Sequence, residues 1–176
     1  LNKNKNFSFT EKDVSKKLLI KTKFDYIIHA AGIPTPSEYK IRPIETLDVS
    51  YFGTRYLVDL AKKMNSKFIF FSSSEIYGNP DGKHIPTPES YRGYVATTGG
   101  RSCYDEGKRI GETLSFAFYE HHGVHTNCIR PFNVYGPGMP QGDYRVLPNF
   151  ALNILKNIKK KRRFGCCLTT RSGRNS

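Results

Sequence analysis

Three short segments of the chain have the pattern of buried β-strands. They lie at residues 25–30, 67–72 and 124–130, and the first two are nearly continuous runs of apolar residues. Apolar runs of this length, each followed by small or polar residues, are typical of parallel strands inside an α/β protein. The pattern therefore predicts three strands of one sheet.

Helical periodicity fills the stretches between and after these strands. Apolar residues recur at three- and four-residue spacing over residues 43–64, and similar patterns predict helices over 102–121 and 146–158. Strands and helices thus alternate, which is typical of parallel strands joined by right-handed crossovers. We expect an α/β fold with a Rossmann-like, doubly wound parallel sheet.

One long segment interrupts this alternation. Residues 77–100 contain five glycines and three prolines, too many for regular secondary structure, and the prolines and serine at 34–37 predict a second irregular stretch. A long loop inside a compact domain usually has a function. The loop 77–100 is therefore a candidate part of the functional site.

The net charge of +13 suggests a nucleic-acid ligand, but the distribution of the charged residues along the chain does not support one. Residues 1–23 carry seven Lys and two acidic residues, residues 156–176 carry eight basic residues and no acid, and residues 24–155 carry thirteen of each sign. A nucleic-acid-binding domain is expected to have a basic face on its folded body. The distribution therefore argues against nucleic acid as a partner and predicts a basic, disordered tail at 161–176.

The sequence also argues against a membrane span, a metal site and a disulfide framework. No apolar segment approaches the roughly 20 residues of a membrane span, and four cysteines lack the spacing of a metal site or a disulfide framework. Three histidines lie near the predicted end of the second helix, where interaction with the helix C-terminus is the default. We expect a cytoplasmic protein without a metal or a membrane partner.

Polar and small residues follow each predicted strand. Since ligands of open α/β sheets bind beyond the carboxyl ends of the strands, these residues are candidates for a binding site. They are Ala30, Ala31 and Gly32 after the first strand, Ser72, Ser73, Ser74 and Glu75 after the second, and Phe132 and Asn133 after the third.

Tyr104 and Lys108 are four residues apart on the predicted helix 102–121, hence on one face of it. Any helix can carry such a pair, but here serines end the preceding strand and lie near that face if the helix packs on the same sheet. A nearby ammonium lowers the pKa of a tyrosine, which then removes a proton from a sugar hydroxyl. We expect Ser73 to hydrogen-bond that hydroxyl while hydride passes to a nicotinamide.

Four motifs together resemble the extended short-chain dehydrogenases that act on nucleotide sugars, the NAD-dependent epimerase/dehydratase family. Within that family the chain is most similar to the UDP-glucuronate decarboxylases, over about residues 25–151. The motifs are His-Ala-Ala-Gly at 29–32, Phe-Ser-Ser-Ser-Glu-Ile-Tyr-Gly at 71–78, Ser-Cys-Tyr-Asp-Glu-Gly-Lys-Arg at 102–109 and Arg-Pro-Phe-Asn-Val-Tyr-Gly-Pro at 130–137.

The resemblance assigns roles position by position. Tyr104 matches the catalytic base and Lys108 the lysine that holds the nicotinamide ribose, while Ser73 and Glu75 match further catalytic and substrate-binding positions. Asn133 matches a ligand of the substrate diphosphate, and Arg145 an arginine on the nucleotide-sugar side. The remaining matches are to positions that contact NAD, namely Ala30, Ala31, Gly32, Ser50, Ser72 and Phe132.

The activity that the resemblance implies begins with oxidation of a nucleotide sugar at C4. Loss of the C6 carboxylate from UDP-glucuronate, giving UDP-xylose after re-reduction, is the expected continuation. Dehydration of dTDP-glucose and 4-epimerisation share the first step and stay open. Family members usually form homodimers through the helices that match 43–64 and 102–121, so a non-catalytic remnant that only dimerises is the alternative of another class.

Two departures from the family pattern bear on whether the chain is a complete catalyst. No glycine precedes Gly32, whereas the family has a βαβ unit with a glycine-rich, pyrophosphate-binding turn before this point. The resemblance also fades near the basic run after residue 160. We therefore expect a truncated chain, with residues 1–160 forming a partial NAD(P)-binding domain that lacks its first βαβ unit and its C-terminal substrate segments.

Overall fold

The computed structural model of the chain describes residues 4–136, 138–139 and 146–156. It consists of two compact units, one up to Phe132 and one from Asn133 onward. Its elements in chain order are β1 (Tyr26–His29), α1 (Pro36–Tyr39), α2 (Pro43–Asp48), the π-helical turn η1 (Val49–Gly53), α3 (Thr54–Met64), β2 (Lys67–Phe71), the 3-10 turns η2 (Ser74–Tyr77) and η3 (Gly82–His84), α4 (Ser102–His122), β3 (Thr126–Ile129) and α5 (Val146–Leu155).

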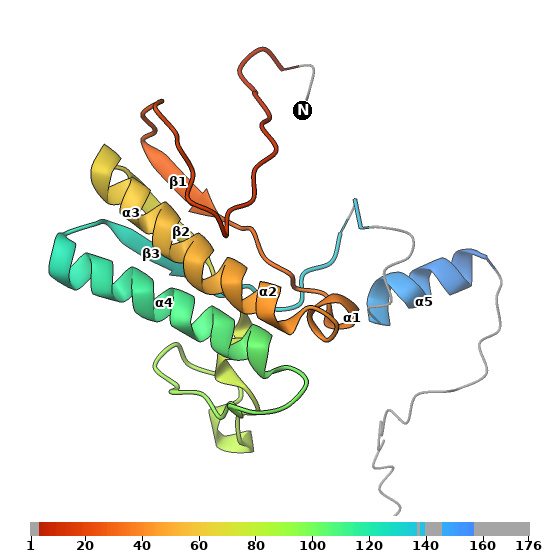
Figure 1. Ribbon diagram of the computed structural model, residues 1–176. Helices are drawn as coiled ribbons and strands as arrows, with labels where there is room; N and C mark the ends of the chain where they lie inside the picture. The colour runs from red at the N-terminus through yellow and green to blue at the C-terminus, as the bar shows by residue number, and fades with distance from the viewer. Residues whose placement is uncertain (1–3, 137, 140–145, 157–176) are drawn as a thin grey trace, which may run out of the picture. The chain divides into compact units, whose positions relative to one another are not determined.

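The three strands form the predicted parallel sheet, in the order β1-β2-β3 (Figure 1). Tyr26 is in register with Lys67, and Phe68 with Thr126. Because β1 leads through α2–α3 to β2, and β2 through α4 to β3, each parallel pair is joined by a helical crossover. This arrangement is the Rossmann-like fold that the alternation of patterns predicts.

The core lies between one face of the sheet and the pair of helices α3 and α4. Alternate strand residues point into it, with Ile27 and His29 from β1 and Phe68 and Phe70 from β2 buried. Their neighbours in the core are Leu57, Val58, Ala61, Phe118 and Val124. The opposite face carries exposed side chains such as Ile28, so the strands are less evenly buried than their apolar sequence predicts.

The predicted helix 43–64 is continuous in the chain but changes its winding. The α-helical segments α2 and α3 are joined by the π-helical turn η1, which contains Ser50. The helix ends at Met64, where Asn65 adopts the left-handed conformation (φ 55°) that closes many helices. The segment 34–37, predicted to be irregular, contributes instead to the single helical turn α1, because Pro36 occupies a first-turn position that needs no N–H donor.

Helix α4 packs closely on the sheet because it carries a glycine where it crosses β2. A Cβ built on Gly111 would lie 2.3 Å from Cζ of Phe70, far inside van der Waals contact. Only glycine therefore fits at this position. Glycine weakens a helix, so its presence inside the predicted helix 102–121 already indicates a close approach to another segment. The close approach brings the N-terminal half of α4 to the carboxyl ends of the strands.

The second unit is described through α5. Helix α5 begins at Val146, as predicted, and ends at Leu155. An Asn153 side-chain amide donates a hydrogen bond to Asn149 Oδ1, 2.7 Å away and one turn earlier. The predicted basic tail 161–176 lies outside the described residues, and so does the proposed domain boundary at 160.

Candidate active site

The carboxyl ends of the three strands meet at one edge of the sheet, and each is followed by candidate residues. Ala30, Ala31 and Gly32 follow β1 and are exposed, whereas Ser72 and Ser73 follow β2 and are buried. The backbone continues the pairing of β2 with β3 beyond the strands, since Ser72 N donates to Ile129 O at 2.8 Å. Serine side chains are thus held at the sheet edge by the main chain.

Tyr104 and Lys108 lie on the face of α4 that meets this edge. Both side chains are almost fully buried, with 9% and 7% of their surfaces exposed. The Lys108 ammonium donates a 2.6 Å hydrogen bond to Phe71 O, the last carbonyl of β2, and lies 5.8 Å from the centroid of the Tyr104 ring. It is also 3.7 Å from the position that a Cβ would take at Gly32. Lys108 therefore connects α4 with the ends of both β1 and β2.

The pKa of Tyr104 is raised above its ordinary value, contrary to the expectation that a lysine neighbour lowers it. Burial is the largest cause, because removing the phenolate from water is unfavourable. A side-chain hydrogen bond with Ser73 acts in the opposite direction and lowers the pKa. The structure thus brings Ser73 and Tyr104 together as the sequence predicts, and burial outweighs the groups that lower the pKa of Tyr104.

Burial acts on Lys108 as well. It lowers the pKa of Lys108 to about 8, so the side chain is mostly protonated at neutral pH and loses its charge at mildly basic pH. Its hydrogen bond to a neutral carbonyl does not replace the hydration that it loses. Lys108 is consequently a hydrogen-bond donor that the fold holds in place and that carries its positive charge at neutral pH.

Glu75 is held by an arginine that sequence reasoning missed. Arg101 Nη2 donates to Glu75 Oε2, and Arg101 Nε lies 3.7 Å from Oδ2 of Asp105, the residue after Tyr104. Burial raises the pKa of the Asp105 carboxyl, while Arg101 lowers it. The sequence does contain a signal for Arg101, because it lies three residues before Tyr104 and four before Asp105. On a helix this spacing places the positive charge of Arg101 and the negative charge of Asp105 next to the tyrosine.

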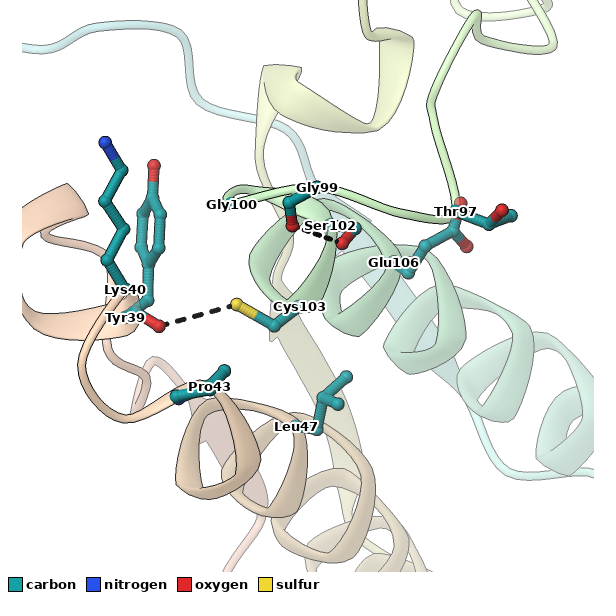
Figure 2. A pocket seen from close by; sticks show the side chains of 10 residues that line it. All are labelled: Tyr39, Lys40, Pro43, Leu47, Thr97, Gly99, Gly100, Ser102, Cys103 and Glu106. Atoms are coloured by element: carbon teal, nitrogen blue, oxygen red, sulfur yellow. Dashed lines mark hydrogen bonds between the residues drawn. The ribbon is translucent and has the colours of Figure 1, made fainter.

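Tyr39 is a second residue of the site that sequence reasoning missed. Its ring stacks on that of Tyr104, with the centroids 5.5 Å apart and the planes at 17°. Tyr39 also lines a cavity of about 500 Å³. Figure 2 shows the side chains around this cavity, and Cys103 Sγ donates to Tyr39 O there at 3.6 Å. Tyr39 ends a single helical turn that is too short to give a periodic signal, so only the structure places it beside the pair.

The predicted cofactor positions fall into two groups. Ser50 is buried in the π-helical turn that contacts α4, and the buried Oγ of Ser72 has no hydrogen-bond partner among the described residues. Phe132 is exposed and stacks on Tyr77, with the centroids 6.3 Å apart. An unpartnered buried hydroxyl, a small residue at Gly32 and a neighbouring lysine donor fit the ribose end of a dinucleotide.

The two predicted ligands of the nucleotide sugar are not joined to this group by the structure. Asn133 is the first residue of the second compact unit, and Arg145 lies outside the described residues. Both therefore stay predictions. Within the described part of the chain, no group of three His, Cys, Asp or Glu side chains is placed to hold a metal ion.

A parallel α/β sheet with a buried Ser, Tyr and Lys at the carboxyl ends of its strands defines a protein of the short-chain dehydrogenase type. A family model described as the NAD dependent epimerase/dehydratase family matches residues 3–172. The chain belongs to this family. The match begins before and ends after the region of the four motifs, and the family description confirms NAD as the cofactor that the motifs predict.

Individual relatives refine this assignment. The chain is 41% identical over 150 residues to UDP-glucuronic acid decarboxylase 5 of Arabidopsis thaliana, covering 85% of the chain and 43% of the relative. It is 39% identical over 151 residues to UDP-glucuronic acid decarboxylase 1 of Xenopus tropicalis, covering 86% and 35%. An epimerase from Methanothermobacter thermautotrophicus has a similar structure, with a TM-score of 0.74 at 26% identity, covering 88% and 46%. The chain thus spans less than half the length of these proteins.

No helix in the described part of the chain is both long and apolar enough to cross a membrane.

Proposed function

We propose that this chain carries the C4-oxidation site of a nucleotide-sugar enzyme, and that its substrate is UDP-glucuronate. The observation that carries the proposal is the burial of Ser73, Tyr104 and Lys108 together at the sheet edge, with the Lys108 ammonium bound to Phe71 O, 5.8 Å from the centroid of the Tyr104 ring and beside Gly32. Similarity of about 40% to UDP-glucuronic acid decarboxylases supports the choice of substrate.

In the proposed reaction, Tyr104 accepts the proton of the C4 hydroxyl. Ser73 donates a hydrogen bond to the same hydroxyl oxygen, and Lys108, on α4 and bound to the last carbonyl of β2, would hold the ribose hydroxyls of the cofactor. Bound NAD supplies the acceptor for the hydride that leaves C4. Because burial raises the resting pKa of Tyr104, the tyrosine would become an effective base once a nearby positive charge favours its phenolate, and the oxidised nicotinamide would supply such a charge.

The second step of the proposed reaction is loss of carbon dioxide. Oxidation at C4 makes the sugar a β-keto acid, so the C5–C6 bond breaks with its electron pair delocalised into the C4 carbonyl. C5 then takes up a proton, and return of the hydride to C4 with the proton from Tyr104 gives UDP-xylose. In the proposed reaction Glu75, which is paired with Arg101, hydrogen-bonds the sugar between C4 and C6.

Product analysis tests the proposal directly. The protein is incubated with NAD and, separately, with UDP-glucuronate, dTDP-glucose and UDP-glucose, and the products are identified by mass spectrometry. We expect UDP-xylose from the first, whereas a 4-keto-6-deoxy sugar or UDP-galactose would assign dehydration or epimerisation instead. Turnover should be lost in Tyr104→Phe and kept in Tyr119→Phe, a matched change at an exposed position of the same helix.

A non-catalytic, dimerising chain is the second candidate function. Exposed apolar and aromatic residues on the two helical segments favour it, including Ile44 and Tyr51 on α2 and η1 and Phe116 on α4. Calorimetric titration with NAD separates the two candidates, since micromolar binding supports the enzyme and absence of binding supports the remnant. Both predict a homodimer, which light scattering would detect and which Tyr51→Glu should dissociate.

A further inference from the structure

Ser73 and the 3-10 turn η2 that follows it lie beside α4, and backbone hydrogen bonds of Ser72 and Ser74 hold the start of this segment against the end of β3. The turn η2 spans Ser74–Tyr77, a single turn whose hydrogen bonds have poorer geometry than those of an α-helix. Ser73 precedes the turn and Glu75 lies within it. The long loop 78–100 follows it. The backbone bonds to β3 fix Ser73 on the side of the sheet, so its position relative to α4 also depends on what joins the turn to that helix.

Arg109, the residue after Lys108 on α4, binds the turn to the loop. Its Nη1 donates to Ile76 O at 3.1 Å and to Arg92 O at 3.0 Å, one carbonyl in the turn and one in the loop. Gly93 leaves the space for this contact, because a Cβ there would lie 2.3 Å from Ile76 O and 2.8 Å from Arg109 Nη1. The helix that carries Tyr104 is thus hydrogen-bonded to the backbone of Ile76, the residue after Glu75.

Arg130, at the end of β3, holds the turn from the other side. Its Nε and Nη2 donate to the two carboxylate oxygens of Glu112 on α4, at 2.9 and 2.7 Å. Its Nη1 donates to Tyr77 Oη and to Glu89 O, both at 2.9 Å, and its guanidinium lies 5.2 Å from the centroid of the Tyr77 ring. One planar side chain therefore joins β3, α4, the end of the turn and the loop.

We propose that Arg109 and Arg130 form a two-arginine clamp that positions Ser73 against Tyr104. They are positioning residues, because both act through the backbone and side chain of η2 and neither contacts Ser73 or Tyr104. The clamp is attached to α4 at two positions, Arg109 and Glu112, and so ties the turn to the helix that carries Tyr104. This inference rests on the proposed function for its catalytic meaning, but the Ser73–Tyr104 contact that the clamp maintains is measurable without turnover.

The test is the ¹³Cζ resonance of Tyr104 at pH 7.5 in tyrosine-labelled protein, since this carbon reports hydrogen bonding of the phenol hydroxyl. Ser73→Ala defines the position of the resonance when the contact is absent. We expect Arg109→Met to shift the resonance to that position, and Arg109→Lys, which keeps a multiple donor, to restore most of the wild-type shift. Arg42→Met, which removes an arginine paired with Glu38 on the surface, is the matched control and should leave the resonance unchanged.

The other half of the clamp is tested by Tyr77→Phe. This change removes only the hydroxyl that accepts the Arg130 hydrogen bond and leaves the ring in place, so it keeps the experiment decisive where Arg109→Met does not fold. We expect a partial shift of the Tyr104 resonance toward its position in Ser73→Ala. A wild-type resonance in every folded clamp variant overturns the proposal.

Turnover separates failure of the clamp from failure of the proposed function. Where the wild-type protein converts UDP-glucuronate, Arg109→Met should lower kcat by roughly a hundredfold and leave the KM for NAD unchanged, because the displaced group is not a cofactor ligand. Absence of turnover in the wild-type protein refutes the function and leaves the resonance test intact. An unchanged kcat in a folded Arg109→Met variant argues against the clamp alone.

Discussion

His29 should make the protein sensitive to mild acid. The side chain is 1% exposed, and burial, with a smaller contribution from the charge of Lys108, lowers its pKa from 6.5 to about 4. The folded protein therefore keeps His29 neutral at pH values where the unfolded chain already binds a proton. Stability is complete above pH 6.5 and is lost progressively as the pH falls toward 4. At about 1.4 kcal/mol for each pKa unit, the loss approaches about 3 kcal/mol.

Urea unfolding followed by circular dichroism, repeated between pH 7.5 and 4, measures this loss. The amide of His29→Gln does not titrate, so the substitution changes the free energy of unfolding by the same amount at every pH. Between pH 7.5 and 4 this variant should therefore lose about 3 kcal/mol less stability than the wild-type protein. His121→Gln, at the exposed end of α4, is the matched control and should retain the wild-type dependence. Parallel pH curves for the wild-type protein and His29→Gln would refute the reasoning.

Three further predictions concern the buried lysine and two glycines. Because burial lowers the pKa of Lys108 from 10.5 to about 8, the wild-type protein should gain about 3 kcal/mol in its free energy of unfolding relative to Lys108→Met as the pH rises from 8 to 10.5, measured by urea unfolding. Gly111→Ala should cost about 1 kcal/mol in a denaturant titration, since overpacking against Phe70 outweighs the gain in helix propensity, and a stabilised variant would contradict this. Gly93→Ala should lower the midpoint of thermal unfolding because Gly93 has a φ of +88°, whereas Gly82→Ala, in open space, should not.

The charge pattern and the elements around the site were accessible from the sequence because they depend on neighbouring residues. Tyr104 and Lys108 share a face of α4 through helical spacing alone, and the serines follow β2 because the apolar run ends there. The direction of the Tyr104 pKa shift was wrong because it depends on burial, which a spacing does not report. The pairing of Arg101 with Glu75 could not be predicted for a similar reason, since the two residues are 26 positions apart in the chain.

The sequence by itself determined the order of strands and helices, the parallel fold and the identity of the residues at the sheet edge, because periodicity and strand ends are local properties. Only the tertiary structure decided which of these residues meet and in what electrostatic state. Contacts between α4 and η2 join segments that are distant in the chain, as in the hydrogen bond from Arg109 to Ile76 O. The state of Lys108 and His29 follows from how much water the packed helices exclude, and that quantity exists only in the folded chain.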